Sequence, residues 1–220
     1  MRVVAVSLLF ALSAVSAVAQ IDLSGEWDPQ FHEDQPERIP GPEIGDYLGL
    51  PITDAARLRA DTWDASLLTL PEHQCKPHPS DYGPRGPANL RIWKEIDPST
   101  QQLIAWRTHI SWQAPERTIY MDGRPHPPAY APHTWQGFST GKWEGDSLVI
   151  DSVSVIDTTW LGRGGFFHSD QMHVVEKFTR QGNVLLYDVT VEDPQVLVEP
   201  YVFPTRIVRQ SQNPDAGLIR

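Results

Sequence analysis

The sequence predicts a mainly β fold, a closed antiparallel barrel with one short helix and an irregular N-terminal arm. From residue 90 onward, apolar and polar residues alternate in segments rich in Val, Ile, Tyr, Trp and Thr, and a period of two is typical of strands. Turn residues such as Asp97-Pro98 and Gln181-Gly182 separate these segments. With one early strand the segments number about eight, which is close to the number that closes a small barrel.

A processing signal is expected at the N-terminus. The chain opens with Met1-Arg2 and an apolar run from Val3 to Val18, which closes in Ala17-Val18-Ala19. This has the form of a signal peptide with a small-x-small cleavage site. The run is short for a membrane anchor, so we expect cleavage of residues 1–19 near Ala19 and a periplasmic or secreted protein without an anchor.

The mature chain, residues 20–220, is expected to form a single barrel domain. Residues 20–89 supply the arm, the helix and loops, and residues 90–210 supply the main strands. The stretch from Trp27 to Pro51 is rich in proline, glycine and acidic residues, which is typical of an irregular arm over a surface.

One helix is expected between the arm and the strands. Thr53 is a typical N-cap, the apolar residues of Asp54 to Leu68 recur at three- and four-residue intervals, and Pro71 would end the helix. The proline-rich stretch from Pro77 to Pro87 then predicts a loop. The predicted strands are Leu23 to Trp27, Leu90 to Ile96, Gln102 to Ile110, Arg117 to Met121, Ser147 to Ile156, Met172 to Arg180, Val184 to Glu192 and Pro204 to Arg209.

The hairpin around Gln181-Gly182 suggests a buried carboxyl group. If Arg180 pairs with Asn183 across a two-residue turn, Glu176 lies opposite Tyr187 on an otherwise apolar face, and His173 lies on the other face. A slip of one residue would exchange the two faces. A carboxylate on an apolar face needs a partner or a function, because its burial is costly.

Two interpretations of Glu176 remain open. In the functional one, Glu176 and His168 form an acid–base pair inside a ligand cavity, and Asp170 orients His168. In the structural one, Glu176 is a satisfied buried carboxyl, hydrogen-bonded to Tyr187 or to an arginine such as Arg107.

A second group of candidates lies in the loops around residues 122–135. Asp122, His126, His133 and Trp135 are expected to shape the entrance to the cavity, because barrels carry their binding loops at strand ends. The alternative makes Asp122 and Arg124 a turn-fixing pair and leaves both histidines on the surface. The remaining expected ligand-binding residues are Trp160, Tyr187 and His173.

Composition and motifs exclude several classes of function. The chain has 28 acidic and 18 basic residues and a formal charge of −10, so nucleic acid is not an expected partner. A single Cys75 cannot form an internal disulfide. The sequence holds no Gly-x-Ser-x-Gly elbow and no P-loop, and we expect no cofactor.

The order His168, His173, Glu176 is loosely similar to the metal-binding motif of cupins, but there is no His-x-His in the chain. We therefore expect no metal site, and a His/Glu metalloenzyme stays an alternative, with zinc or iron as the metals.

Three strings resemble a large group of exported bacterial proteins known mainly as hypothetical. They are Met121-Asp122-Gly123-Arg124-Pro125-His126-Pro127, Gly141-Lys142-Trp143-Glu144-Gly145-Asp146-Ser147-Leu148-Val149 and His168-Ser169-Asp170-Gln171-Met172-His173-Val174-Val175-Glu176. The resemblance implies no activity. The opening Gly25-Glu26-Trp27 is similar to the Gly-x-Trp start of lipocalins, where the Trp closes the barrel base, and it favours a lipocalin-like, calycin-type barrel.

The expected function is that of an exported, cofactor-independent lyase, isomerase or cyclase that applies acid–base chemistry to a small hydrophobic or aromatic molecule in the barrel cavity. The main alternative is a non-catalytic carrier of such a molecule, and the second is the metalloenzyme. Substrate identity and oligomeric state are not predicted.

Overall fold

The computed structural model describes residues 21–30, 50–62, 66, 69–71, 76–86, 88–111, 115–159 and 167–213. It is a mainly β structure, as predicted. Its strands are β1 (Gly25–Pro29), β2 (Leu90–Ile96), β3 (Leu103–Ile110), β4 (Glu116–Tyr120), β5 (Phe138–Glu144), β6 (Ser147–Val153), β7 (His173–Gln181), β8 (Val184–Glu192), β9 (Tyr201–Val202) and β10 (Arg206–Gln210). The described helices are α1 (Asp54–Ala60) and the 3-10 helix η3 (Ser80–Arg85).

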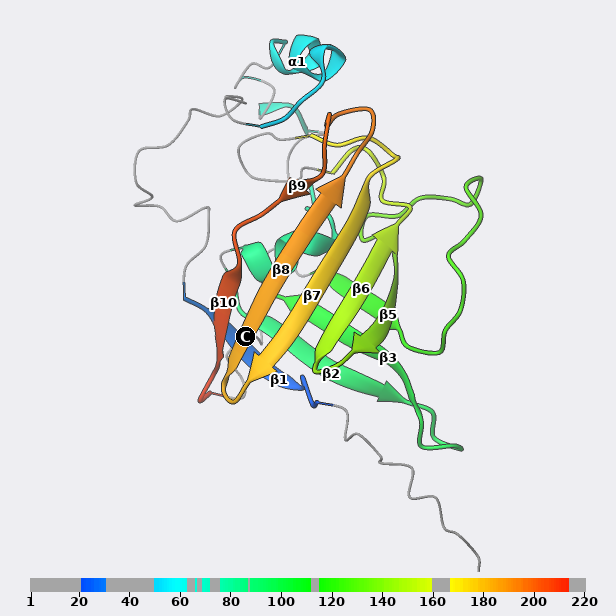
Figure 1. The fold of residues 1–220 in the computed structure, drawn as a ribbon, viewed down its shortest axis with the longest axis vertical. Helices are drawn as coiled ribbons and strands as arrows, with labels where there is room; N and C mark the ends of the chain where they lie inside the picture. Colours follow the sequence, from blue (N-terminus) through cyan, green and yellow to red (C-terminus); the bar gives the residue numbers. More distant parts are fainter. Residues whose placement is uncertain are drawn as a thin grey trace, which may run out of the picture.

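Nine of the strands close into a barrel, consistent with the lipocalin-like shape expected from the sequence. The strands from β1 to β8 follow one another around the ring, and β10 pairs with both β8 and β1 to complete it (Figure 1). The short β9 pairs with the other end of β8. Closure removes the exposed edges that an open sheet would leave for aggregation.

One junction of the ring is parallel, which the sequence did not predict. Strands β4 and β5 run in the same direction, so the chain must return from one end of the barrel to the other between them. Residues 121–137 make this connection as a long loop that projects from the side of the barrel (Figure 1).

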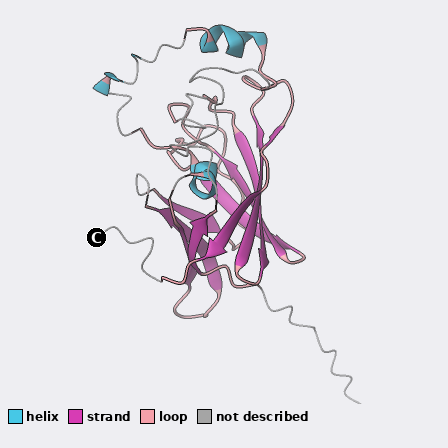
Figure 2. Ribbon diagram, turned by 90° about the vertical axis from the view of Figure 1, so that its left-hand side faces the viewer, coloured by secondary structure: helices cyan, strands magenta, loops and turns pink. Residues whose placement is uncertain are grey.

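The interior of the barrel is filled by apolar side chains and by η3. Figures 1 and 2 show η3 between the front and back walls of the ring, and Tyr82 and Arg85 in it are fully buried. The largest buried apolar side chains include Trp27, Trp106, Tyr187, Phe178, Ile119, Leu148, Ile150 and Leu185. Residues expected to form a loop thus enter the barrel as a plug.

Trp27 lies in the core at one end of the barrel. Its indole Nε1 donates to the carbonyl of Leu23 at 3.0 Å, and the guanidinium of Arg180 lies 5.2 Å from the centre of its ring. A buried Trp covered by Arg gains both packing and cation–π energy. The role expected for the Gly-x-Trp start, that of closing the barrel base, fits this placement.

Helix α1 begins as predicted and is shorter than expected. The Thr53 hydroxyl accepts from the backbone N–H of Ala56 at 3.1 Å, which satisfies one of the free donors of the first turn. The helix ends at Ala60, far before Pro71. Leu58 in this helix is exposed.

Among the described residues, no helix is long and apolar enough to cross a membrane.

The strand predictions are close, and two strands were missed, β5 and the two-residue β9. The predicted strand Leu90 to Ile96 matches β2 and Val184 to Glu192 matches β8. Strand β5 was not predicted because two of its inward positions hold the small residues Ser139 and Gly141: a Cβ on Gly141 would lie 2.6 Å from the sulfur of Met121. Packing requires a small residue there, so the sequence of this strand does not show the alternation of apolar and polar residues by which strands are predicted.

The β7–β8 register differs from the predicted one by two residues. Gly182 and Asn183 form the turn, and Gly182 has φ +64°, which suits glycine at the first central position of a type II′ turn. Glu176 therefore pairs with Val189. A shift of two residues preserves the faces, so Glu176 points inward as predicted and His173 points outward.

Candidate functional site

Glu176 forms an ion pair inside the barrel. Its side chain is fully buried, and the guanidinium of Arg117 binds both carboxylate oxygens: Nη1 donates to Oε1 at 2.9 Å and Nη2 donates to Oε2. The fork-like contact matches the planar geometry of the two groups. The structure favours the structural interpretation of Glu176, with Arg117 as the partner.

Arg107, suggested as a partner by the sequence, lies elsewhere. It is on the outer face of β3, where it pairs with Glu95 and Glu116. Sequence analysis placed Arg117 in a predicted strand but did not identify it as the partner of Glu176. The Arg117 side chain points inward because of the register of β4 against β3. The β7–β8 hairpin, from which Glu176 was placed, does not define that register.

The Arg117 guanidinium also donates hydrogen bonds to the wall of the barrel. Nε donates to the Ser139 hydroxyl at 2.9 Å and Nη2 to the Ser152 hydroxyl at 2.6 Å. The Tyr187 hydroxyl donates to Glu176 Oε1 at 2.8 Å. Burial raises the pKa of Tyr187 well above its ordinary value, so it remains a donor. The buried charges of Arg117 and Glu176 are therefore balanced by each other and by these neutral hydrogen bonds, which form one network.

The same network holds η3 in the lumen. The Tyr187 hydroxyl lies 3.0 Å from the Asp81 carbonyl, so its single proton is shared between this oxygen and Glu176 Oε1, and Arg117 Nη1 lies 3.4 Å from the Ser80 carbonyl. Both contacts are made to the backbone of η3. They fix the position of the Asp81 side chain relative to the wall of the barrel.

Asp81 is a second fully buried carboxyl, and sequence analysis missed it. Its Oδ2 accepts from Arg85 Nη2 at 2.8 Å, whereas its Oδ1 has no hydrogen-bond partner among the described residues. The hydroxyl of neighbouring Ser80 is also buried without such a partner. Burial raises the pKa of Asp81 against the opposing charge of Arg85, and the Glu176 carboxylate raises it further.

His168 lies inside as well and is shifted the opposite way. Burial lowers the pKa of His168, although the hydrogen bond to the Ser169 carbonyl and the charge of Asp81 both act to raise it. Because the Asp81 charge acts on His168 and the His168 charge acts on Asp81, the two groups lie within electrostatic reach of each other.

The contacts of His168 define its tautomer. Nδ1 lies 2.9 Å from the Ser169 carbonyl oxygen, which can only accept, so Nδ1 carries the proton. Nε2 is hydrogen-bonded to the Thr159 hydroxyl, which also lies 3.1 Å from the Ile156 carbonyl. If Nε2 gains a proton it donates to Thr159, whose own proton then turns to Ile156, so both states of the ring are satisfied.

The expected Asp170–His168 pair does not form. Both ring nitrogens of His168 are bonded to other groups, and Asp170 is exposed. The carboxylate that orders this segment is Asp193, which accepts from the Ser169 N–H at 2.6 Å and from the Ser169 hydroxyl at 2.7 Å. Asp170 points to solvent because it lies at the turn that precedes β7.

A histidine–carboxylate cluster occupies the outer face of β6, β7 and β8. His173 lies between Asp151, with Nε2 2.8 Å from Oδ1, and Glu192, with Nδ1 3.2 Å from Oε2. The crossover loop adds His126, whose Nε2 is 3.1 Å from the Thr140 hydroxyl and 3.6 Å from Asp151 Oδ1. His126 therefore meets His173 across Asp151.

The hydrogen bonds of this outer cluster act on the charge of His173. Partial burial lowers its pKa, but the contacts with Asp151 and Glu192 outweigh burial, so the net shift is upward. Among the residues that the structure describes, no three side chains of His, Cys, Asp and Glu are arranged to hold a metal ion.

The other candidates of the crossover loop do not line the lumen. Asp122 binds Arg124, with Nη2 2.6 Å from Oδ2, which is the turn-fixing pair of the alternative interpretation. The His133 Nδ1 donates to the Val155 carbonyl at 3.3 Å, and Trp135 is 47% exposed. Trp160 lies outside the described residues.

Little in the sequence identified Asp81. It lies in a proline-rich stretch that predicts a loop, and loops usually lie on the surface. The available signal was the pair Asp81 and Arg85 at a spacing of four, flanking Tyr82. Such spacing indicates a contact within a helical turn, but it does not show that the turn is buried.

Comparison of the chain with models of protein families, with curated proteins and with solved structures finds no match. The function must therefore be argued from the site itself.

Proposed function

We propose that the protein is an exported acid–base enzyme, a cofactor-independent lyase, isomerase or cyclase that acts on a small hydrophobic or aromatic molecule. In this proposal the acid is Asp81 and the base is His168. Arg117 and Tyr187 are positioning residues, because they contact the backbone of η3 and so place the Asp81 carboxyl, and Glu176 is one because it binds both of them.

The observation that carries the proposal is that one oxygen of the buried Asp81 carboxyl, Oδ1, has no hydrogen-bond partner in the part of the chain that the structure describes. A fully buried carboxyl with one unpartnered oxygen is costly for a protein to maintain, and a bound molecule that satisfies this oxygen would remove the cost. Ser80 supplies a second buried polar atom next to it. Glu176, in contrast, has no oxygen left without a hydrogen bond.

The two pKa shifts supply the chemistry. A raised pKa keeps Asp81 protonated to higher pH, so that it can donate a proton, and a lowered pKa keeps His168 neutral to lower pH, so that it can accept one. A proton taken from substrate carbon reaches Nε2 of His168 by way of the Thr159 hydroxyl, and Asp81 Oδ1 protonates the leaving or rearranging atom. This proton exchange is the common step of lyases and isomerases.

The experiment uses an unbiased substrate source. The protein is incubated with a periplasmic metabolite extract, and mass spectrometry identifies masses that are consumed and formed. Asp81→Asn should reduce conversion at least about 100-fold, because the amide retains the shape of the acid but cannot donate its proton. Asp188→Asn is the matched control, since Asp188 lies on the outer face of β8 and bonds Thr205.

The outcomes separate the enzyme from the carrier. Full conversion by Asp81→Asn, with the far-UV spectrum and thermal midpoint of the wild type, would remove Asp81 from the chemistry. Retention of an extract component that is returned unchanged would identify a carrier of the same shape.

A further inference from the structure

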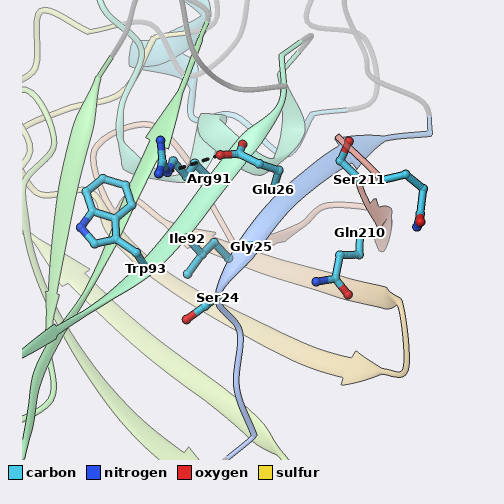
Figure 3. A pocket seen from close by; sticks show the side chains of 9 residues that line it. Ser24, Gly25, Glu26, Arg91, Ile92, Trp93, Gln210 and Ser211 are labelled. Atoms are coloured by element: carbon cyan, nitrogen blue, oxygen red, sulfur yellow. Dashed lines mark ion pairs between the residues drawn. The ribbon is translucent and has the colours of Figure 1, made fainter. Parts of the chain in front are cut away.

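A pocket lies on the outer side of the barrel base, away from η3. Its volume is about 340 Å³, which is within the range of small-molecule sites. Figure 3 shows its two sides, with Arg91 and Trp93 of β2 facing Gln210 and Ser211 across β1. The full lining is Ser24, Gly25, Glu26, Arg91, Ile92, Trp93, Gln210, Ser211 and Gln212.

The floor of the pocket is open because Gly25 has no side chain. Gly25 has φ +142°, a conformation that side chains rarely adopt, and an added Cβ would lie 3.1 Å from Gln210 Nε2. A residue with a side chain here would both strain the backbone and narrow the pocket. The Gly-x-Trp sequence therefore shapes two features: Trp27 fills the core and Gly25 leaves the outer pocket free.

Arg91 is oriented toward this pocket by a buried acid. The Glu26 side chain is only 4% exposed, and its Oε1 lies 3.3 Å from Arg91 Nε (Figure 3). The Arg91 side chain is 41% exposed, and its two Nη groups have no hydrogen-bond partner among the described residues. The acid is thus shielded behind the guanidinium, and the exposed edge of the guanidinium presents parallel N–H donors.

Trp93 provides a flat apolar surface beside that charge. The Arg91 guanidinium carbon lies 5.8 Å from the centre of the Trp93 ring, so one ligand can contact both side chains. Parallel donors recognise a carboxylate in bidentate fashion, and an indole face stacks on a ring. Gln210 and Ser211 on the opposite side add neutral hydrogen-bonding groups.

We propose that this basal pocket is a second ligand site, independent of the lumen, which binds small aromatic carboxylates. The carboxylate takes the two Nη groups of Arg91, and the ring stacks on Trp93. The chain as a whole carries a formal charge of −10, so the attraction for an anion here would come from the local charge of Arg91.

Benzoate is the probe, and benzyl alcohol is the neutral comparison of similar size. Titration is followed by the indole N–H resonances in a ¹H–¹⁵N spectrum, with the Trp93 signal assigned by Trp93→Phe. Benzoate should shift the Trp93 signal and bind at least tenfold more tightly than benzyl alcohol. Arg91→Gln should abolish this preference, and Arg91→Lys should retain only part of it because a lysine lacks the planar fork.

Arg107→Gln is the matched control. Arg107 lies on the same outer surface, is paired with Glu95 and Glu116, and does not line the pocket, so its variant should bind benzoate like the wild type. The proposal is wrong if benzoate leaves the Trp93 signal unmoved, if both probes bind equally, or if Arg91→Gln and Arg107→Gln weaken binding to the same extent.

Discussion

The inside and the outside of the barrel each hold a histidine beside two carboxylates, and the pKa values of the two histidines are shifted in opposite directions. Inside, His168 lies within electrostatic reach of Asp81 and Asp193; outside, His173 lies between Asp151 and Glu192. The pKa of His168 is lowered and that of His173 is raised. The same residue types therefore favour the neutral ring in one place and the charged ring in the other.

The difference comes from the depth of burial and from the direct contacts of each ring. His168 is 1% exposed, and loss of solvation there outweighs the attraction of nearby carboxylates. The His173 side chain is 32% exposed, so its charge keeps some water in addition to two direct carboxylate contacts. A His-rich sequence string is thus no guide to acid–base chemistry until the face of each histidine is known.

The largest effect should come from breaking the interior ion pair. Glu176→Gln leaves the Arg117 guanidinium buried without a counter-charge, which typically costs about 3–5 kcal/mol. That is a large part of the stability of an ordinary domain. Urea unfolding at neutral pH measures the change. The matched outer variant, Glu192→Gln, should change the free energy of unfolding by less than about 0.5 kcal/mol, because Glu192 is half exposed.

A double variant sharpens this prediction. Arg117→Met with Glu176→Met removes both charges together, so it should be less destabilised than either single change. If Glu176→Gln and Glu192→Gln had equal small effects, the interior pair would not be the structural element that the geometry indicates.

The second effect is a loss of stability in acid that depends on His168. A histidine with a lowered folded-state pKa contributes stability above its ordinary value of 6.5, and this contribution is lost as pH falls through the lowered pKa. We expect the free energy of unfolding to fall as the pH is lowered through this range. His168→Gln should remove this acid-dependent part, whatever its effect at neutral pH. Unfolding midpoints measured between pH 7 and 5 show this loss. If they depended on pH in the same way in His168→Gln as in the wild type, the assignment to His168 would be wrong.

The sequence predicted the barrel well because strand patterns are local. Alternation placed most of the strands, and the two-residue register error in the β7–β8 hairpin preserved the faces, so Glu176 and His173 were assigned to the correct sides. Strand β5 was missed because Gly141 faces a crowded interior, and packing against Met121 requires a small residue there.

The candidate site was less predictable because its contacts join distant parts of the chain. Arg117 and Glu176 come from strands that are not neighbours in the ring, and Asp81 enters from a segment without strand or helix periodicity. Prolines in that segment suggested an exposed loop, and only tertiary contacts with Tyr187 and Arg117 show that it fills the lumen. Spacing along the sequence does not encode such contacts.

The smallest effect should come from the outer cluster and should have the opposite sign. A histidine with a raised folded-state pKa contributes stability below 6.5, and this contribution is lost as pH rises through the raised pKa. His173→Gln should therefore lower the unfolding free energy at pH 6 by less than about 1 kcal/mol and leave it unchanged at pH 9, because partly exposed pairs are screened by water.

Salt provides the control for that measurement. Raising the ionic strength to about 1 M shortens the Debye length to about 3 Å, so the difference between wild type and His173→Gln at pH 6 should shrink, whereas the acid-dependent loss assigned to buried His168 should persist. If the two histidines responded to salt and pH in the same way, burial would not be what distinguishes the inside of this barrel from its outer face.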